Sequence, residues 1–361
     1  MNKNVLKLIT GVALLALTAF LAGGIFLFGD ILLAVNTIQE LESNLYALEY
    51  KGDYGFDAFL ESGGASSDTE VAAYLTSFLS RGFYKPDTTV STGEFGCSTV
   101  CIKEQTGQVT FGRNYDWAPC SAMIVHTEPR QGYESVSTCC LDFLGFGKDY
   151  QPTGSLLNKM MSLAAIYVPL DGMNEKGLMV ADLMAGDTEV THQNAGKPDL
   201  TTTTAIRLLL DRAANVEEAL ELLRQYDMHS SMDSAHHLSI ADASGRSVVA
   251  EYINGELIVT ETPVVTNHYL APGEKHGIGS AQSHTRFESL SRQLEAGKTN
   301  VDRMLQSVAQ KNYPQTPDGY EKTMWSIVYH PVDNTAHFYF AENYEHSYRL
   351  ALQSRYSWLV R

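Results

Sequence analysis

Residues 97–117 read CSTVCIKEQTGQVTFGRNYDW, and this stretch has the pattern of a β-hairpin. Two runs of alternating residue types, Cys97–Lys103 and Gln108–Asp116, flank a short segment at 105–107 that contains a turn-forming glycine. Antiparallel pairing around that turn places Cys97 across from Tyr115. The hairpin therefore predicts which side chains lie close to Cys97.

The same pairing brings Arg113 and Asp116 close to the Cys97 thiol. A thiol has an ordinary pKa of about 8.5, so it needs a base to act as a nucleophile at neutral pH. The hairpin contains no histidine. If the Gly96–Cys97 bond were cut, Cys97 would carry its own base, an α-amine with a pKa of about 7.7–8.0. Asp116 could then hold this amine, and Arg113 could stabilise a thiolate. A buried Arg–Asp pair is also an ordinary structural device, so the hairpin alone leaves both interpretations open.

The rest of the chain after Cys97 predicts an α+β domain with antiparallel sheets. Strand patterns recur at 237–241, 247–253, 256–260, 324–330 and 335–340. Helical patterns lie between them at 203–214, 215–224, 286–295 and 301–309. The second of these helices has Asn215 as its expected N-cap, followed by Glu218 as in a capping box. Strands followed by paired helices and further strands indicate a layered fold.

The segment before the hairpin has a different pattern. Two pieces, Thr37–Glu49 and Thr69–Arg81, are expected to be helical, and a Gly/Ser-rich break separates them at 62–67. We therefore divide the chain into an N-terminal segment at 1–35, a helical leader or propeptide at 36–96, and a main domain at 97–361.

The N-terminal segment predicts export. Lys3 and Lys7 precede 22 uncharged residues, Leu8 to Gly29, and Asp30 ends the run. This length suits a bilayer-spanning helix, and the leading positive charge predicts that the rest of the chain lies outside the cytoplasm. Residues 8–29 are thus expected to contact the membrane. A cleaved signal, with small residues at 22–24, and a buried core helix are the alternatives.

Composition restricts the partners and cofactors. The 361 residues are 44% hydrophobic and 19% charged, as in a globular protein. A net charge of −16 argues against nucleic acid, because phosphate contact needs clustered Lys and Arg. Besides Cys97, four cysteines remain, which could form three alternative sets of disulfides or stay as buried thiols. Their spacing predicts no zinc site, and no metal or cofactor is expected. The four are Cys101, Cys120, Cys139 and Cys140.

Several motifs together resemble the cysteine N-terminal-nucleophile hydrolases. These include bile salt hydrolases, penicillin V acylases, acid ceramidase-like amidases and penicillin acyltransferases. Phe95-Gly96-Cys97-Ser98-Thr99 with Gly112-Arg113-Asn114-Tyr115-Asp116-Trp117 resembles the opening of this family. In the family a cysteine, an arginine sixteen residues on and an aspartate three further form the active centre, which implies Cys97, Arg113 and Asp116 here.

Three later motifs follow in the family's order. The run 171–178, DGMNEKGL, resembles a strand-edge motif whose asparagine lies in the active site, matched by Asn174. The run 264–268, VVTNH, resembles the segment that supplies an oxyanion asparagine, matched by Asn267. The run 283–287, SHTRF, resembles the segment with the last active-site arginine, matched by Arg286.

The resemblance implies a four-layer αββα fold with two stacked antiparallel sheets and autocatalytic cleavage at Gly96–Cys97. It also implies a hydrolase that cleaves a linear amide C–N bond of a small N-acyl substrate, such as a bile salt, a fatty amide or a penicillin V-like compound. An acyltransferase and a membrane-anchored binding protein on an inactive hydrolase scaffold are the alternatives. The protein could form a homo-oligomer, or a heterodimer of the leader and the catalytic fragment.

The acyl group is expected to bind between Cys120 and Leu170. Within that region, 143–146 and 160–167 are apolar enough to form a hydrophobic acyl pocket. Ordinary core packing or a dimer contact would explain the same apolar residues.

Overall fold

The predicted hairpin is present in the computed structural model, which describes residues 29–79, 96–313, 322–355 and 357–361. Strands β3 (Gly96–Lys103) and β4 (Val109–Trp117) pair antiparallel, with Cys97 opposite Tyr115 as predicted. The turn closes where the Glu104 N–H donates to the Gln108 carbonyl at 2.8 Å. Gly107 has φ 88° there, a backbone conformation that glycine adopts without a steric penalty.

The hairpin is part of a seven-stranded antiparallel sheet with the order β14-β3-β4-β15-β16-β17-β18. The predicted hairpin near the end of the chain supplies β15 and β16, and β15 pairs directly with β4. The remaining strands of this sheet are β14 (Val264–Val265), β15 (Lys322–His330), β16 (Thr335–Phe340), β17 (Tyr348–Ala351) and β18 (Leu359–Val360).

A nine-stranded sheet lies against the first, with the order β1-β2-β5-β6-β7-β8-β11-β12-β13. All of its pairs are antiparallel except β2 with β5. Its strands are β1 (Gln39–Glu42), β2 (Leu45–Lys51), β5 (Ala122–Glu128), β6 (Ser135–Cys140), β7 (Asp171–Asn174), β8 (Met179–Met184), β11 (His236–Ala241), β12 (Ser247–Ile253) and β13 (Glu256–Glu261). The predicted strands at 237–260 are thus confirmed.

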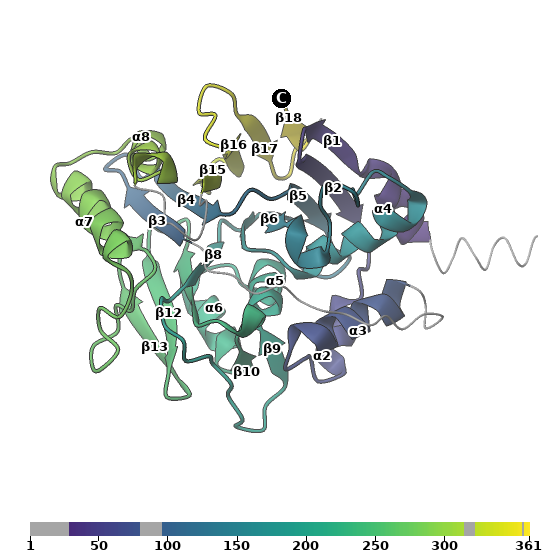
Figure 1. Ribbon diagram of the computed structural model, residues 1–361, viewed down its shortest axis with the longest axis horizontal. Coiled ribbons are helices and arrows are strands. Elements are labelled where there is room, and N and C mark those ends of the chain that lie inside the picture. The colour runs from purple at the N-terminus through teal and green to yellow at the C-terminus, as the bar shows by residue number, and fades with distance from the viewer. Residues whose placement is uncertain (1–28, 80–95, 314–321, 356) are drawn as a thin grey trace, which may run out of the picture.

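Helices cover the outer face of each sheet, which confirms the four-layer αββα prediction. An apolar cluster that contains Cys97 and Trp325 joins the facing sides of the two sheets. Figure 1 shows α7 and α8 beside β3 and β4, and the other helices in a separate group. Besides a helix at 29–37, the α-helices among the described residues are α2 (Phe56–Glu61), α3 (Asp68–Leu79), α4 (Leu156–Ser162), α5 (Thr202–Arg212), α6 (Val216–Leu223), α7 (Ala281–Glu295) and α8 (Val301–Ser307). Strands β9 (Asp199–Thr201) and β10 (Asp227–His229) form a small parallel pair.

Local sequence explains two features of the helical layers. Asn215 caps α6 as predicted, because its side chain accepts the Glu218 N–H at 3.0 Å. Gly112 in β4 lies directly beneath α8, where a Cβ would stand 2.3 Å from Val301 Cγ1. Only glycine therefore lets α8 approach the hairpin this closely.

The helix predicted for Thr37–Glu49 is wrong. Residues 39–42 and 45–51 form β1 and β2, and β2 inserts beside β5 in the nine-stranded sheet. Leu45 to Leu48 are all buried because the sheet is covered on both faces, so the alternation that marks a half-exposed strand is missing. The second predicted helix, 69–81, is confirmed as α3 over Asp68–Leu79.

The predicted membrane contact at 8–29 lies outside the described residues except for its last position. Residues 29–37 form a helix. Within the ranges that the structure describes, no helix is both long enough and apolar enough to cross a bilayer.

Candidate active site

The Cys97 thiol and the Arg113 guanidinium meet between the two sheets. Thr99 pairs with Arg113 across the hairpin, and side chains two residues apart on a strand share a face. Cys97 and Arg113 therefore point the same way, and Arg113 Nη2 lies 3.4 Å from Cys97 Sγ. Both side chains are fully buried. This geometry agrees with the proximity predicted from the hairpin.

Three residues outside the predicted set hold Arg113 in place. The Asp171 carboxylate forms an ion pair with Arg113 and also accepts hydrogen bonds from Trp325 Nε1 at 3.0 Å and Tyr329 Oη at 2.6 Å. Asp171 is the first residue of the 171–178 motif. The family resemblance indicated the asparagine of that motif, and no local pattern pointed to the aspartate.

Asn267 and Arg286 bind the backbone of Cys97. Asn267 Oδ1 accepts the Cys97 N–H at 2.7 Å and Arg286 Nη2 at 2.8 Å, while its amide nitrogen donates to the Met184 carbonyl at 2.9 Å. Arg286 Nη1 donates to the Cys97 carbonyl at 2.5 Å. In this arrangement Asn267 holds the nitrogen that cleavage would free, rather than pointing a donor at a substrate oxygen.

Asp116 lies on the other face of β4, toward α7. Its carboxylate accepts hydrogen bonds from Thr323 at 2.7 Å, Gln310 at 3.0 Å and Arg286 at 3.2 Å. It is next to the peptide bond before Cys97, because a Cβ at Gly96 would stand 3.2 Å from Asp116 Oδ2. Burial raises the pKa of Asp116, and Arg286 opposes that shift.

Asn174 is not brought to Cys97. Its side-chain oxygen accepts the N–H groups of Lys176 and Leu178, each at 3.1 Å. Its amide nitrogen donates to the carbonyls of Leu210 at 3.0 Å and Ala213 at 2.7 Å. Asn174 therefore shapes the β7–β8 turn and ties it to the end of α5, which leaves it no free donor for an oxyanion.

The chain as it stands keeps the thiol protonated. The pKa of Cys97 is raised to about 12, mainly by burial; Arg113 and Arg286 lower it, and Asp116 and Asp182 raise it. A thiol with such a pKa supplies almost no thiolate at neutral pH. Attack by Cys97 on an external substrate at neutral pH therefore requires a base that the uncut chain lacks at this position.

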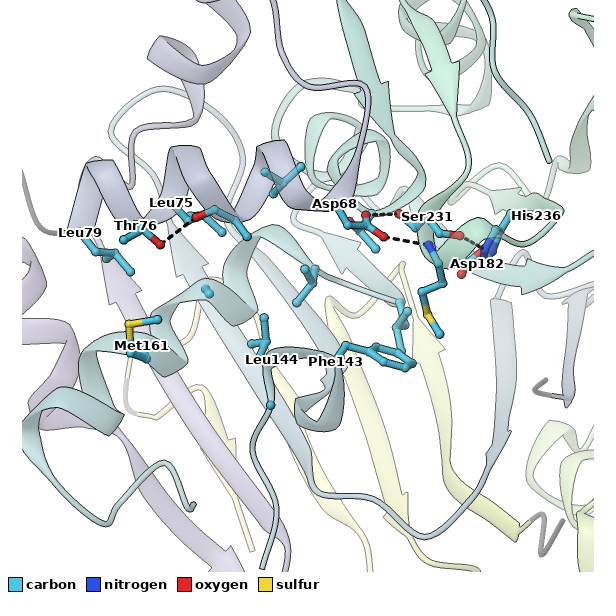
Figure 2. A pocket seen from close by; sticks show the side chains of 18 residues that line it. Asp68, Leu75, Thr76, Leu79, Phe143, Leu144, Met161, Asp182, Ser231 and His236 are labelled. Atoms are coloured by element: carbon cyan, nitrogen blue, oxygen red, sulfur yellow. Dashed lines mark hydrogen bonds and ion pairs between the residues drawn. The ribbon is translucent and has the colours of Figure 1, made fainter. Parts of the chain in front are cut away.

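A cavity of about 310 Å³ lies beside this centre. Figure 2 shows α3 along one side of it, with Leu75 and Leu79, and Phe143, Leu144 and Met161 on the opposite side. Four of its polar residues, Asp68, Ser231, His236 and Asp182, gather at one end. Leu170 and Met232 line the cavity and belong to the same apolar cluster as Cys97. The region expected from sequence to bind an acyl group thus lines a cavity.

One group of side chains in the described ranges has the geometry to hold a metal ion. The ligand atoms of Cys120, Cys140 and Asp142 lie within 4.8 Å of one another. The spacing of these residues in sequence predicted no metal site. All five cysteines are free thiols in the structure.

Comparison with known proteins identifies the family. The family model described as acyl-coenzyme A:6-aminopenicillanic acid acyl-transferase matches residues 102–345, which is more than half of the chain. The chain belongs to this family. It is therefore a member of the N-terminal-nucleophile hydrolase superfamily that the motifs predicted.

Individual relatives agree with this assignment. A penicillin V acylase from Pectobacterium atrosepticum is 33% identical over 99 residues. That match spans 25% of this chain and only 26% of the acylase. The fold is similar to a conjugated bile acid hydrolase from Clostridium perfringens, with a TM-score of 0.53 and 16% identity over 71% of this chain and 92% of that one.

Proposed function

We propose that this member of the acyl-transferase family is the precursor of a linear amide hydrolase whose nucleophile is the Cys97 thiol. The observation that carries the proposal is the double fixation of Cys97. Arg113 lies 3.4 Å from its sulfur, and Asn267 accepts the N–H of its nitrogen at 2.7 Å. Both atoms are therefore oriented for reaction, the sulfur as nucleophile and the nitrogen, once it is freed, as base.

The first reaction frees the amine. The Cys97 sulfur attacks the Gly96 carbonyl carbon, the C–N bond to Cys97 breaks, and the nitrogen takes the thiol proton. Water then hydrolyses the resulting thioester, which leaves a carboxylate on Gly96 and an α-amine on Cys97. Asp116 and Gln310 lie next to Gly96 and are the groups placed to orient this peptide.

The second reaction uses the freed amine on an external amide. The thiol proton passes to the α-amine, which Asn267 orients, while the sulfur attacks the substrate carbonyl. The ammonium then protonates the departing nitrogen, and water hydrolyses the acyl-enzyme. Arg113 stabilises negative charge at the sulfur because it is held rigidly by Asp171, so little reorganisation is needed.

We further propose that the acyl group of the substrate is apolar and binds in the cavity beside the site. Its walls are mainly aliphatic and aromatic, contributed by α3 and by residues 143–145 and 161–170. Burial of an aliphatic chain against them contributes about 0.8 kcal/mol per methylene group.

The leader is proposed to stay bound after cleavage, and the apolar residues 8–29 are proposed to tether it to a membrane outside the cytoplasm. Leu45 and Leu48 in β2 are fully buried in the nine-stranded sheet, and α3 lines the cavity. Loss of the leader would therefore open both the core and the cavity.

The mass of the purified protein tests the proposal directly. Wild-type protein is expected to yield a fragment that begins at Cys97, and Cys97→Ala is expected to remain one chain. Active wild-type protein that remains uncut at Gly96–Cys97 would overturn the mechanism. The same result without activity would favour a membrane-anchored binding protein on an inactive scaffold.

The family's name favours a second candidate, an acyltransferase that passes the acyl group from Cys97 to an amine acceptor. The two activities share every step up to the acyl-enzyme. Product analysis with and without 6-aminopenicillanic acid as acceptor separates them, because only a transferase forms a new amide in its presence.

A further inference from the structure

A hydrogen-bonded path begins at the N-terminus of α3 in the leader. The Asp68 carboxylate accepts the Ser231 hydroxyl at 2.9 Å and the Met232 N–H at 2.8 Å. The Ser231 carbonyl in turn accepts His236 Nε2 at 2.9 Å. Figure 2 shows Asp68, Ser231 and His236 in sequence along the polar end of the cavity.

The path continues through the nine-stranded sheet to Cys97. His236 Nδ1 lies 2.8 Å from the Asp182 carboxylate, which is diagonally across the β11–β8 pair on the same face. The backbone carbonyl of Asp182 accepts Arg113 Nη2 at 2.8 Å, and the same nitrogen lies 3.4 Å from Cys97 Sγ. The side chain of Asp182 therefore lines the cavity, while its backbone carbonyl binds the catalytic arginine.

Charge at this position matters because Asp182 and His236 are both buried. Burial lowers the pKa of His236, but the carboxylates of Asp182 and, further away, Asp68 raise it, and the pKa lies above the ordinary value. Both ring nitrogens also face acceptors, the Asp182 carboxylate and the Ser231 carbonyl, and this arrangement favours the doubly protonated imidazolium. That positive charge neutralises Asp182, which otherwise opposes thiolate formation at Cys97. The other charges that act on Cys97 are those of Arg113, Asp116 and Arg286.

We propose that His236 is a positioning residue of the hydrolytic centre, which holds and neutralises Asp182 so that Arg113 stays at the Cys97 sulfur, and that α3 of the leader fixes His236 through Asp68 and Ser231. This inference rests on the proposed function. It adds that the leader supports the nucleophile as well as lining the cavity.

The test measures the reactivity of Cys97 itself. Processed protein is alkylated with iodoacetamide across a range of pH, and the peptide that starts at Cys97 is quantified by mass spectrometry. In His236→Gln the Asp182 charge is uncompensated, so the profile moves to higher pH by about one unit and alkylation below the thiol pKa slows about tenfold. In His236→Gln/Asp182→Asn both charges are gone, and the rate returns to within about twofold of the wild type.

His126→Gln is the matched control. His126 is a buried histidine whose Nε2 lies 2.8 Å from a carboxylate, that of Glu134, and it neither lines the cavity nor acts on Cys97. Its alkylation profile is expected to match the wild type. A purely structural role for His236 would leave the rate equally low in the double variant.

An unshifted profile in His236→Gln, or a shift that Asp182→Asn does not reverse, overturns the inference while the proposed function stands. If His236→Gln does not fold, Asp182→Asn alone decides, since a rise in the Cys97 pKa in that variant contradicts the proposed role. A wild-type chain without a free amine at Cys97 overturns the proposed function and this inference together.

Discussion

At the residue scale, the family resemblance indicated two active-site asparagines, but only one of them contacts Cys97. Asn267 contacts the nitrogen of Cys97, whereas Asn174 contacts only backbone groups of a turn and of the end of α5. A motif match carries the residue type to a position, but the contacts decide what the side chain does there. The two residues therefore make a matched pair of variants.

Asn267→Ala is expected to slow processing at Gly96–Cys97 roughly tenfold to a hundredfold, because the Cys97 nitrogen loses the group that orients it. Asn174→Ala is expected to process normally once folded, but to lower the free energy of unfolding by at least about 1–3 kcal/mol, because buried backbone groups lose their partners. Time courses of fragment formation and denaturant melts measure the two effects. Normal processing in Asn267→Ala would contradict its assigned role.

His268, the neighbour of Asn267, is expected to make the stability of the fold depend on pH. Burial, with help from His284 and His237, lowers the pKa of His268 to about 4. A histidine whose folded pKa lies below its unfolded value stabilises the fold above about pH 6.5, and this stability is lost as the pH falls toward 4. The melting temperature of His268→Gln should therefore fall less steeply than that of the wild type as the pH is lowered over that interval. His236 and His126 act with the opposite sign, since their pKa values are raised.

At the element scale, the hairpin could be predicted from sequence because its contacts are local. One turn sets the register that joins Cys97 to Tyr115 and Arg113. Asp171, Trp325 and Tyr329 could not be found this way, since they reach Arg113 only after β15 pairs with β4 and the two sheets stack. The strand β2 was missed for a related reason. It is buried on both faces, and its parallel partner β5 is far away in sequence.

The contact between α8 and β4 is expected to be intolerant of any side chain at position 112. Gly112→Ala places a methyl group against Val301 and should lower the free energy of unfolding by about 1–3 kcal/mol. Val301→Ala removes the clashing methyl groups, so the double variant should regain part of this loss. Denaturant unfolding of the four proteins measures the coupling, and strictly additive effects would show that α8 does not press on Gly112.

Helix α3 is expected to set the length of the acyl group. Leu75→Trp fills part of the cavity, because Leu75 lies in its wall on α3. The kcat/KM for a long aliphatic acyl amide should fall about tenfold or more, while that for the acetyl homologue should change little, since only the long chain needs the lost space. Leu294→Trp, on α7 at the far side of the molecule, is the control. Equal loss for both substrates in Leu75→Trp would place the acyl group elsewhere.

At the scale of the whole molecule, cleavage before Cys97 would divide the chain without dividing the core. The leader supplies β1, β2, α2 and α3, and Leu45, Tyr46 and Phe59 are buried against residues that follow Cys97. Each large apolar side chain of this kind contributes about 2–5 kcal/mol of stability. The two fragments therefore share one folding unit.

Processed protein is accordingly expected to elute as one species containing both fragments, and to separate only in denaturant at the concentration that unfolds the fold. Leu45→Ala/Leu48→Ala weakens the packing of β2, so fragments of this variant should separate at lower denaturant than the wild type. The Cys97→Ala chain stays in one piece, so its unfolding midpoint gives the denaturant concentration at which the fold itself is lost. Release of the large fragment from wild type in plain buffer would contradict a shared core, and release without detergent from membranes would also exclude tethering through the leader.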